Sequence, residues 1–134
     1  MTIEHVDIGI VSATAELAEF YRAVFEAEVL EPRRFPFATV HRLALGPVTL
    51  KIMVPEQTPE APSADSKFWD RQGFRYLTLW VDDLTALAEG WARLGGTVAM
   101  EPVELRPGVW TALLVDPDGN TIEAMRQTRS PQDG

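Results

Sequence analysis

Four side chains that could carry acid–base or ligand chemistry lie on short segments of alternating apolar residues: His5, Lys51, Tyr76 and Glu123. A carboxylate can act as a general base or bind a divalent metal, and a histidine can serve as a ligand, an acid or a base. Lysine at neutral pH is a cation with no lone pair, and tyrosine ionises only near a pKa of about 10. His5 and Glu123 are therefore the candidate metal ligands, whereas Lys51 and Tyr76 are poor ones.

A sharp turn precedes the strand that carries Glu123. The turn reads Asp-Pro-Asp-Gly over residues 116–119. Its proline presets the first turn dihedral, and its glycine can take a positive φ. Apolar residues on both sides predict a hairpin. Alternation in the second strand then puts Glu123 on the face opposite to Ile122 and Ala124.

The two halves of the chain show the same order of elements. Alternating apolar residues predict strands, and apolar residues at helical spacing predict helices. The first half gives strand, helix and three strands, over residues 3–11, 12–27, 28–31, 37–45 and 48–54. The second half gives the same order over residues 74–81, 82–96, 97–105, 109–116 and 120–127.

Sequence similarity between the halves indicates an internal duplication. The segment HVDIGIV aligns with YLTLWVD at a shift of 71 residues, the helices align at about 70, and TLKIM aligns with TIEAM at 72. Such a near-constant shift is typical of a repeat. We predict one α+β domain of two βαβββ modules, residues 1–55 and 73–127, with a linker over 56–72 and a tail over 128–134. Two twisted, mixed sheets of this kind would curve around a cleft.

Alternation also predicts which residues face that cleft and which face the helices. The predicted cleft-facing residues are His5, Asp7, Lys51, Met53, Tyr76, Thr78, Trp80, Thr121, Glu123 and Met125. The predicted helix-facing core residues are Val6, Ile8, Leu50, Ile52, Leu77, Leu79, Ile122 and Ala124.

Composition excludes several classes of partner. The formal net charge of −8 argues against nucleic acid, because phosphate binding needs a basic face. No apolar run approaches the roughly 20 residues that span a bilayer, so we expect no membrane partner. The absence of cysteine excludes disulfides and thiolate chemistry. With no recognisable signal peptide, a cytoplasmic location is the expectation.

The chain resembles the vicinal oxygen chelate superfamily, which includes glyoxalase I, methylmalonyl-CoA epimerase, extradiol dioxygenases and bleomycin-resistance proteins. The resemblance lies in EHVDIGIVSATAELAEFYRAVF, RYLTLWVDDLTALAEGWARLGG and LLVDPDGNTIEAM. Metal-dependent members hold an ion in the cleft on four side chains, from the first and last strands of each module. The resemblance carries those positions to His5, Lys51, Tyr76 and Glu123, and it implies a homodimer.

Three interpretations of this constellation stay open. Lys51 and Glu123 could form an ion pair that fills the metal position, Glu123 could be a metal ligand, or it could be a metal-free base of the kind that glyoxalases and epimerases use for proton abstraction. His41 and Arg42 are strand neighbours, so only one can face the cleft. If that residue is His41, it adds a third ligand to His5 and Glu123, as in the two-histidine, one-carboxylate iron sites.

Further residues are candidates for the cleft wall. Trp80, Trp110, Met53 and Met125 would make an apolar, aromatic surface suited to a flat or hydrophobic ligand, or they could be core or dimer packing. Tyr76 and Thr78 would line the same wall. Arg106, beside a Pro-Gly turn, is a candidate rim contact for an anionic ligand.

Two classes of function remain. In the first, the chain is a binding protein without a metal, resembling the acidic bleomycin-resistance group that takes cationic drugs. In the second, it is a lyase, isomerase or dioxygenase that binds a divalent metal through His5 and Glu123. A metal-free enzyme that uses His5, Tyr76 and Glu123 as acids and bases also fits the residues.

Overall fold

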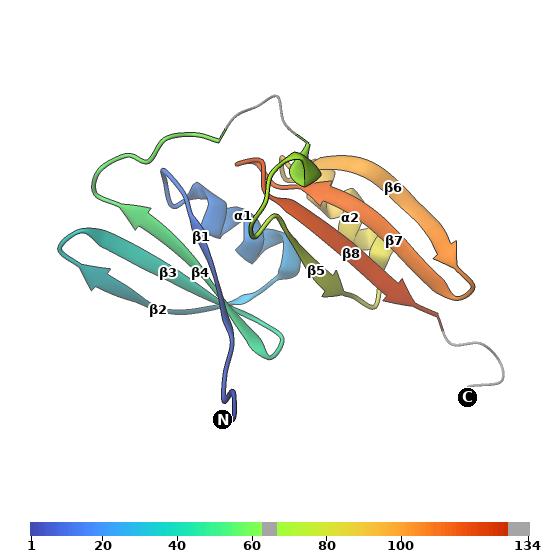
Figure 1. Cartoon of the computed structure of the whole chain (residues 1–134), viewed down its shortest axis with the longest axis horizontal. Coiled ribbons are helices and arrows are strands. Elements are labelled where there is room, and N and C mark those ends of the chain that lie inside the picture. The colour runs from blue at the N-terminus through green and yellow to red at the C-terminus, as the bar shows by residue number, and fades with distance from the viewer. Residues whose placement is uncertain (63–66, 129–134) are drawn as a thin grey trace. The chain divides into compact units, whose positions relative to one another are not determined.

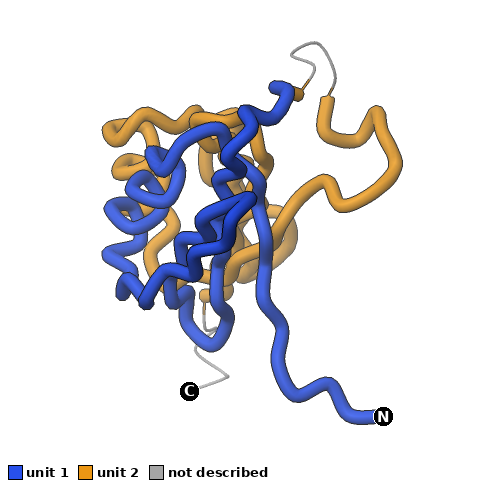
Figure 2. Tube along the Cα trace, turned by 90° about the vertical axis from the view of Figure 1, so that its left-hand side faces the viewer, with its two compact units in different colours: residues 1–61 blue, residues 62–134 orange. Residues whose placement is uncertain are grey.

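The computed structural model describes residues 1–62 and 67–128, and the chain divides into two compact units, residues 1–61 and 62–134 (Figure 2). The division falls inside the predicted linker, residues 56–72. Apart from Thr128, the predicted tail lies outside the described residues.

The first unit contains one helix and four strands (Figure 1). Its elements are β1 (Asp7–Val11), α1 (Glu16–Phe25), β2 (Glu28–Phe35), β3 (Ala38–Leu45) and β4 (Val48–Pro55). The strand order in the sheet is β1-β4-β3-β2. β1 and β4 pair in parallel, and the other neighbours are antiparallel. This is a βαβββ module with a mixed sheet.

The second unit repeats that plan. Its elements are the short 3₁₀ helix η1 (Phe68–Asp70), β5 (Tyr76–Trp80), α2 (Leu84–Arg93), β6 (Thr97–Arg106), β7 (Val109–Val115) and β8 (Thr121–Gln127). The order β5-β8-β7-β6 copies that of the first sheet, with β5 and β8 parallel. The predicted α+β fold of two βαβββ modules is confirmed.

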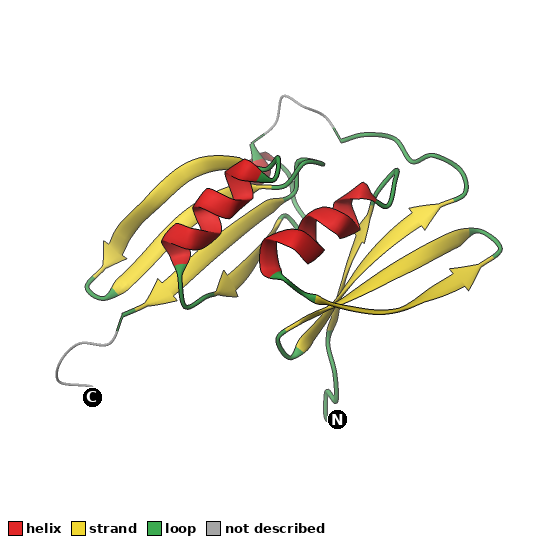
Figure 3. Ribbon diagram, turned by 180° about the vertical axis from the view of Figure 1, so that it is seen from behind, coloured by secondary structure: helices red, strands yellow, loops and turns green. Residues whose placement is uncertain are grey.

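Each helix packs against its own sheet (Figure 3). In α1 the buried residues are Leu17, Ala18, Phe20 and Tyr21, and in α2 they include Leu84, Leu87, Ala88 and Trp91. These positions recur at three- and four-residue spacing, which places them on one side of a helix. None of the described helices is long and apolar enough to cross a bilayer.

The sheets meet the helices with the residues that alternation predicts. Leu50 and Ile52 of β4 and Ile122 and Ala124 of β8 are at most 2% exposed. Val6 is an exception, because β1 begins only at Asp7 and Val6 is 56% exposed before it. The prediction of Val6 as a core residue is therefore wrong, and His5 also lies before the strand rather than on it.

The predicted Asp-Pro-Asp-Gly turn closes the hairpin of β7 and β8. The buried Asp116 carboxylate accepts hydrogen bonds at 2.9 Å from the backbone N–H groups of Asp118 and Asn120, and also from the Asn120 side chain. Gly119 takes a φ of 95°, which favours glycine. The turn thereby fixes the start of β8 and so the position of Glu123 on that strand.

Candidate functional site

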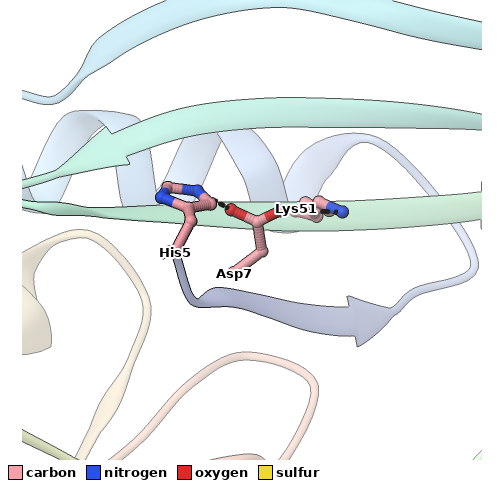
Figure 4. A network of polar contacts seen from close by, with 3 residues as sticks. All are labelled: His5, Asp7 and Lys51. Carbon is pink, nitrogen blue, oxygen red and sulfur yellow. Dashed lines mark hydrogen bonds and ion pairs between the residues drawn. The ribbon is translucent and has the colours of Figure 1, made fainter. Parts of the chain in front are cut away.

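Three polar side chains form a network at the edge of the first sheet (Figure 4). Lys51 Nζ lies 3.0 Å from Asp7 Oδ2, and His5 Nε2 lies 2.5 Å from Asp7 Oδ1. β1 and β4 are adjacent and parallel, with Gly9 opposite Lys51, so Asp7 lies diagonally across from the lysine on the same face. The hydrogen bond from Lys51, together with the contact to His5, lowers the pKa of Asp7 below its ordinary value.

The network borders a groove in the first unit. The groove has a volume of about 560 Å³. Its polar lining comes from Asp7, Arg33, Arg42 and Lys51, and its apolar lining from Ile10, Val11, Phe35, Phe37, Val40 and Met53, next to Gly9. The volume lies in the range typical of small-molecule sites. The predicted ligand-binding residues Lys51 and Met53 therefore belong to one surface.

The β3–β4 register shows which of His41 and Arg42 shares the face of Lys51. Arg42 lies directly opposite Lys51, whereas His41 lies opposite the buried Ile52 on the helix-covered face. His41 accordingly borders a separate cavity of about 280 Å³ together with Ala18 and other residues of α1. His41 therefore leaves the sheet on the face opposite to Lys51, and its role as a third metal ligand stays a prediction.

In the second unit the carboxylate of Glu123 has a partner on the adjacent strand. Thr78 Oγ1 donates a hydrogen bond of 2.8 Å to Glu123 Oε1, and the two residues are direct opposites in the parallel β5–β8 pair. Glu123 is half-buried. The predicted ion pair between Lys51 and Glu123 joins residues of different units and stays a prediction, while Asp7 is the acidic partner of Lys51 within its own unit.

Aromatic side chains gather around the start of β5. The Tyr76 ring meets Phe68 edge to face, with centroids 5.4 Å apart, and Phe68 meets Trp69 in the same way at 4.9 Å. Tyr76 and Trp80 are each more than half exposed. Both residues lie on β5. Their predicted role as an aromatic surface for a ligand stays a proposal.

Two predicted wall residues have other surroundings. Trp110 lies opposite Arg126 and on the same face of the sheet as Ala112 and Ala124, which α2 covers. It does not share the face of Glu123, contrary to the prediction. Met125 does share that face and is only 4% exposed, and its role as a ligand contact stays a prediction. Arg106 ends β6 as an exposed side chain, and its role stays a prediction.

The strand ladders relate the two modules differently from the sequence alignment. Asp7 lies opposite Thr49 and Tyr76 opposite Thr121, so β4 maps to β8 at a shift of 72 residues while β1 maps to β5 at 69. Two backbone hydrogen bonds show the same two shifts. The N–H group of Ser12 donates to the Met53 carbonyl, and the N–H group of Val81 donates to the Met125 carbonyl. The structural counterpart of Tyr76 is therefore Asp7 rather than His5.

Asp7 is thus the residue of the network that the sequence patterns did not single out. Its place on the predicted cleft face, with the same parity as His5, was the available signal. A shift of two residues leaves every side chain of a strand on its original face, because side chains alternate with a period of two. The alignment of the two halves at a shift of 71 residues therefore could not show whether His5 or Asp7 is the counterpart of Tyr76.

The donor chemistry of the two modules does not suit the divalent metal that the resemblance implies. The first module holds Asp7 and Lys51 at the corresponding positions, the second holds Tyr76 and Glu123, and the Asp7 carboxylate already contacts an ammonium group at 3.0 Å. An ammonium group has no lone pair, and its charge opposes a second cation. Within residues 1–62 and 67–128, no three His, Asp or Glu side chains gather as a metal site.

Comparison with known proteins agrees with this architecture. The family model of the Glyoxalase/Bleomycin resistance protein/Dioxygenase superfamily matches residues 2–124. A glyoxalase family protein from Enterococcus faecalis is 25% identical, with a TM-score of 0.68 over 92% of this chain and 96% of that one. A glyoxalase family protein from Bacillus cereus has a TM-score of 0.81 at 10% identity, covering 96% and 97% of the two chains.

A third similar structure is longer than this chain. Glyoxalase I from Zea mays is 21% identical, with a TM-score of 0.73 over 95% of this chain but only 46% of its own. No curated protein matches the chain. The family match spans both βαβββ modules, and the chain belongs to the Glyoxalase/Bleomycin resistance protein/Dioxygenase superfamily.

Proposed function

We propose that this chain binds a small organic molecule in the groove of its first unit and does so without a resident divalent metal. One observation carries the proposal: the contact of 3.0 Å between Lys51 and Asp7. Lys51 is the counterpart of Glu123 of the second module. Its ammonium group pairs with the Asp7 carboxylate, which would otherwise be free to bind a metal. The groove beside this pair supplies a volume of about 560 Å³ for an organic ligand.

The test is a metal titration of the wild type beside a charge-reversed variant. Protein purified without chelator is expected to hold no stoichiometric metal and to show no thermal shift with Zn²⁺, Ni²⁺, Mn²⁺ or Fe²⁺. Lys51→Glu, which places two carboxylates together, is expected to gain a metal-dependent thermal shift. Arg34→Glu is the matched control, because it makes the same charge change on the opposite face of the same module.

The alternative is a metal-dependent lyase, isomerase or dioxygenase with His5 and Glu123 as ligands. Near-stoichiometric metal in the wild type that both His5→Ala and Glu123→Gln abolish would establish this alternative and end our proposal. Roles for His5, Tyr76 and Glu123 as acids and bases are proposals of the same kind. Each predicts that the corresponding variant loses turnover while it keeps its fold.

We also propose that the chain forms a homodimer. β1 and β5 are edge strands, and their last residues, Val11 and Trp80, are 54% and 56% exposed. Exposed apolar side chains on sheet edges favour association. Light scattering is expected to give twice the chain mass for the wild type. A monomeric mass at micromolar concentration would refute this proposal.

A further inference from the structure

We propose that the groove of the first module binds an aromatic anion, meaning a planar apolar body that carries a carboxylate or a phosphate. The inference deepens the proposed function, on which it rests, by naming the class of ligand. It concerns residues of the first unit alone.

The charges of the first unit are unevenly distributed. Residues 1–61 contain nine acidic and five basic side chains. Three of the five basic residues line the groove, Arg33, Arg42 and Lys51, but Asp7 is the one acidic residue in its lining. Lys51 neutralises Asp7 through the ion pair at 3.0 Å. The two guanidinium groups therefore leave the groove with a net positive charge inside an acidic protein.

The strand register brings both arginines to one face. Arg33 of β2 lies opposite Val40 of β3, and Val40 and Arg42 are two residues apart on the same strand. Arg42 donates a hydrogen bond of 3.0 Å to the carbonyl of Glu31, which anchors its side chain and engages one of five N–H donors. No ion pair joins Arg33 or Arg42 to a carboxylate among the residues that the structure describes. Planar guanidinium groups match carboxylate and phosphate oxygens in pairs.

An aromatic pair lies beside these cations. The rings of Phe35 and Phe37 are stacked with centroids 5.5 Å apart and an interplanar angle of 20°. Both line the groove, and they are 47% and 62% exposed. Large exposed aromatics at a cavity supply area for a flat ligand, because ring faces stack favourably. A planar body against the phenylalanines would hold its charged group toward the arginines.

The inference opposes the expectation of a cationic ligand that the net charge of −8 suggested. Exposed charges are screened beyond about 8 Å at physiological ionic strength. The guanidinium groups that line the groove therefore affect a bound ligand more strongly than the distant carboxylates of the chain do. Local charge, rather than net charge, selects the ligand.

The experiment compares three probes that share one naphthyl ring and differ in the charged group, by isothermal calorimetry and NMR. They are 1-naphthoate, 1-naphthyl phosphate and 1-naphthylmethylamine. We expect the wild type to bind one or both anions at millimolar concentration or better, and at least tenfold more tightly than the amine. The anion that binds more tightly identifies the charged group of the ligand as a carboxylate or a phosphate.

A matched pair of variants locates the binding. Arg33→Gln is expected to weaken the anion about tenfold or more, the usual loss when one partner of a charged hydrogen bond is removed. Arg34→Gln, one residue along and on the other face, is expected to change the affinity less than twofold. Equal losses in both variants would overturn the assignment to this groove, and so would tight binding of the amine or no binding of either anion. The metal titration above is independent, so the loss of this inference leaves the metal-free proposal intact.

Discussion

Asp7 and Tyr76 occupy the same place in the two modules. Each is the first residue of its strand, and each lies opposite a threonine that precedes Lys51 or Glu123 by two residues. The first module places a carboxylate at this position against an ammonium group, while the second has a tyrosine there and a hydrogen bond from Thr78 to Glu123. The duplicated backbone thus carries two different chemistries at matching positions.

The ion pair of Asp7 predicts a pH-dependent contribution to stability. The pKa of Asp7 is lowered in the folded state, chiefly by the hydrogen bond from Lys51. A lowered folded pKa means that the contribution is present above the unfolded value, near 3.8, and is lost as the pH falls through the folded value. In Lys51→Met we expect an NMR titration to show the pKa of Asp7 moved back toward 3.8.

Arg22 provides the control for that titration. Its side chain pairs with Glu19 at 2.7 Å and lowers the pKa of Glu19 instead. Arg22→Met should raise the pKa of Glu19 and leave that of Asp7 unchanged. An Asp7 titration that did not respond to Lys51→Met would show that the pair does not persist in solution.

The hydrogen bond from Thr78 to Glu123 predicts a measurable loss of stability on its removal. Thr78→Val keeps the shape of the side chain but leaves a half-buried carboxylate without its donor at 2.8 Å. We expect the free energy of unfolding to fall by about 1–2 kcal/mol in urea denaturation. Thr85→Val, on the exposed side of α2, should stay within about 0.5 kcal/mol of the wild type. If the two variants were equally stable, the hydrogen bond would have no net effect.

The turn before β8 predicts a larger effect. Asp116→Ala removes a buried acceptor of two backbone N–H groups at 2.9 Å. Unsatisfied buried donors cost about 1–3 kcal/mol, so we expect thermal unfolding to occur several degrees lower. Glu104→Ala, an exposed acidic residue of β6, serves as the comparison and should be near neutral. Wild-type stability of the Asp116 variant would mean that water replaces the carboxylate at no cost.

Two glycines of the second module predict opposite responses to alanine. A Cβ on Gly96 would lie 2.2 Å from Nε1 of the buried Trp91, whose indole also donates to the Val115 carbonyl at 2.8 Å. Gly96→Ala should therefore destabilise by about 1–3 kcal/mol. Gly90 lies in α2, where its Cβ would meet no atom closer than 3.7 Å. Gly90→Ala should stabilise by about 0.5–1 kcal/mol, and calorimetry distinguishes the two signs.

The sequence by itself determined the duplicated βαβββ plan and the core faces of the sheets. Both depend on local patterns: apolar spacing fixes the type of element, and alternation fixes the buried side of a strand. Leu50, Ile52, Ile122 and Ala124 lie in the core as predicted. The turn before Glu123 was also predictable, because proline and glycine fix backbone dihedrals locally.

Only the tertiary structure decided which residues are neighbours across strands. It replaced His5 by Asp7 as the counterpart of Tyr76, put Arg42 rather than His41 beside Lys51, and turned Trp110 toward α2. The register of distant strands depends on bulges, strand starts and hydrogen-bond ladders, and no local pattern contains it. A shift of two residues preserves alternation, so the sequence determined the face of each side chain, and the fold determined its partner.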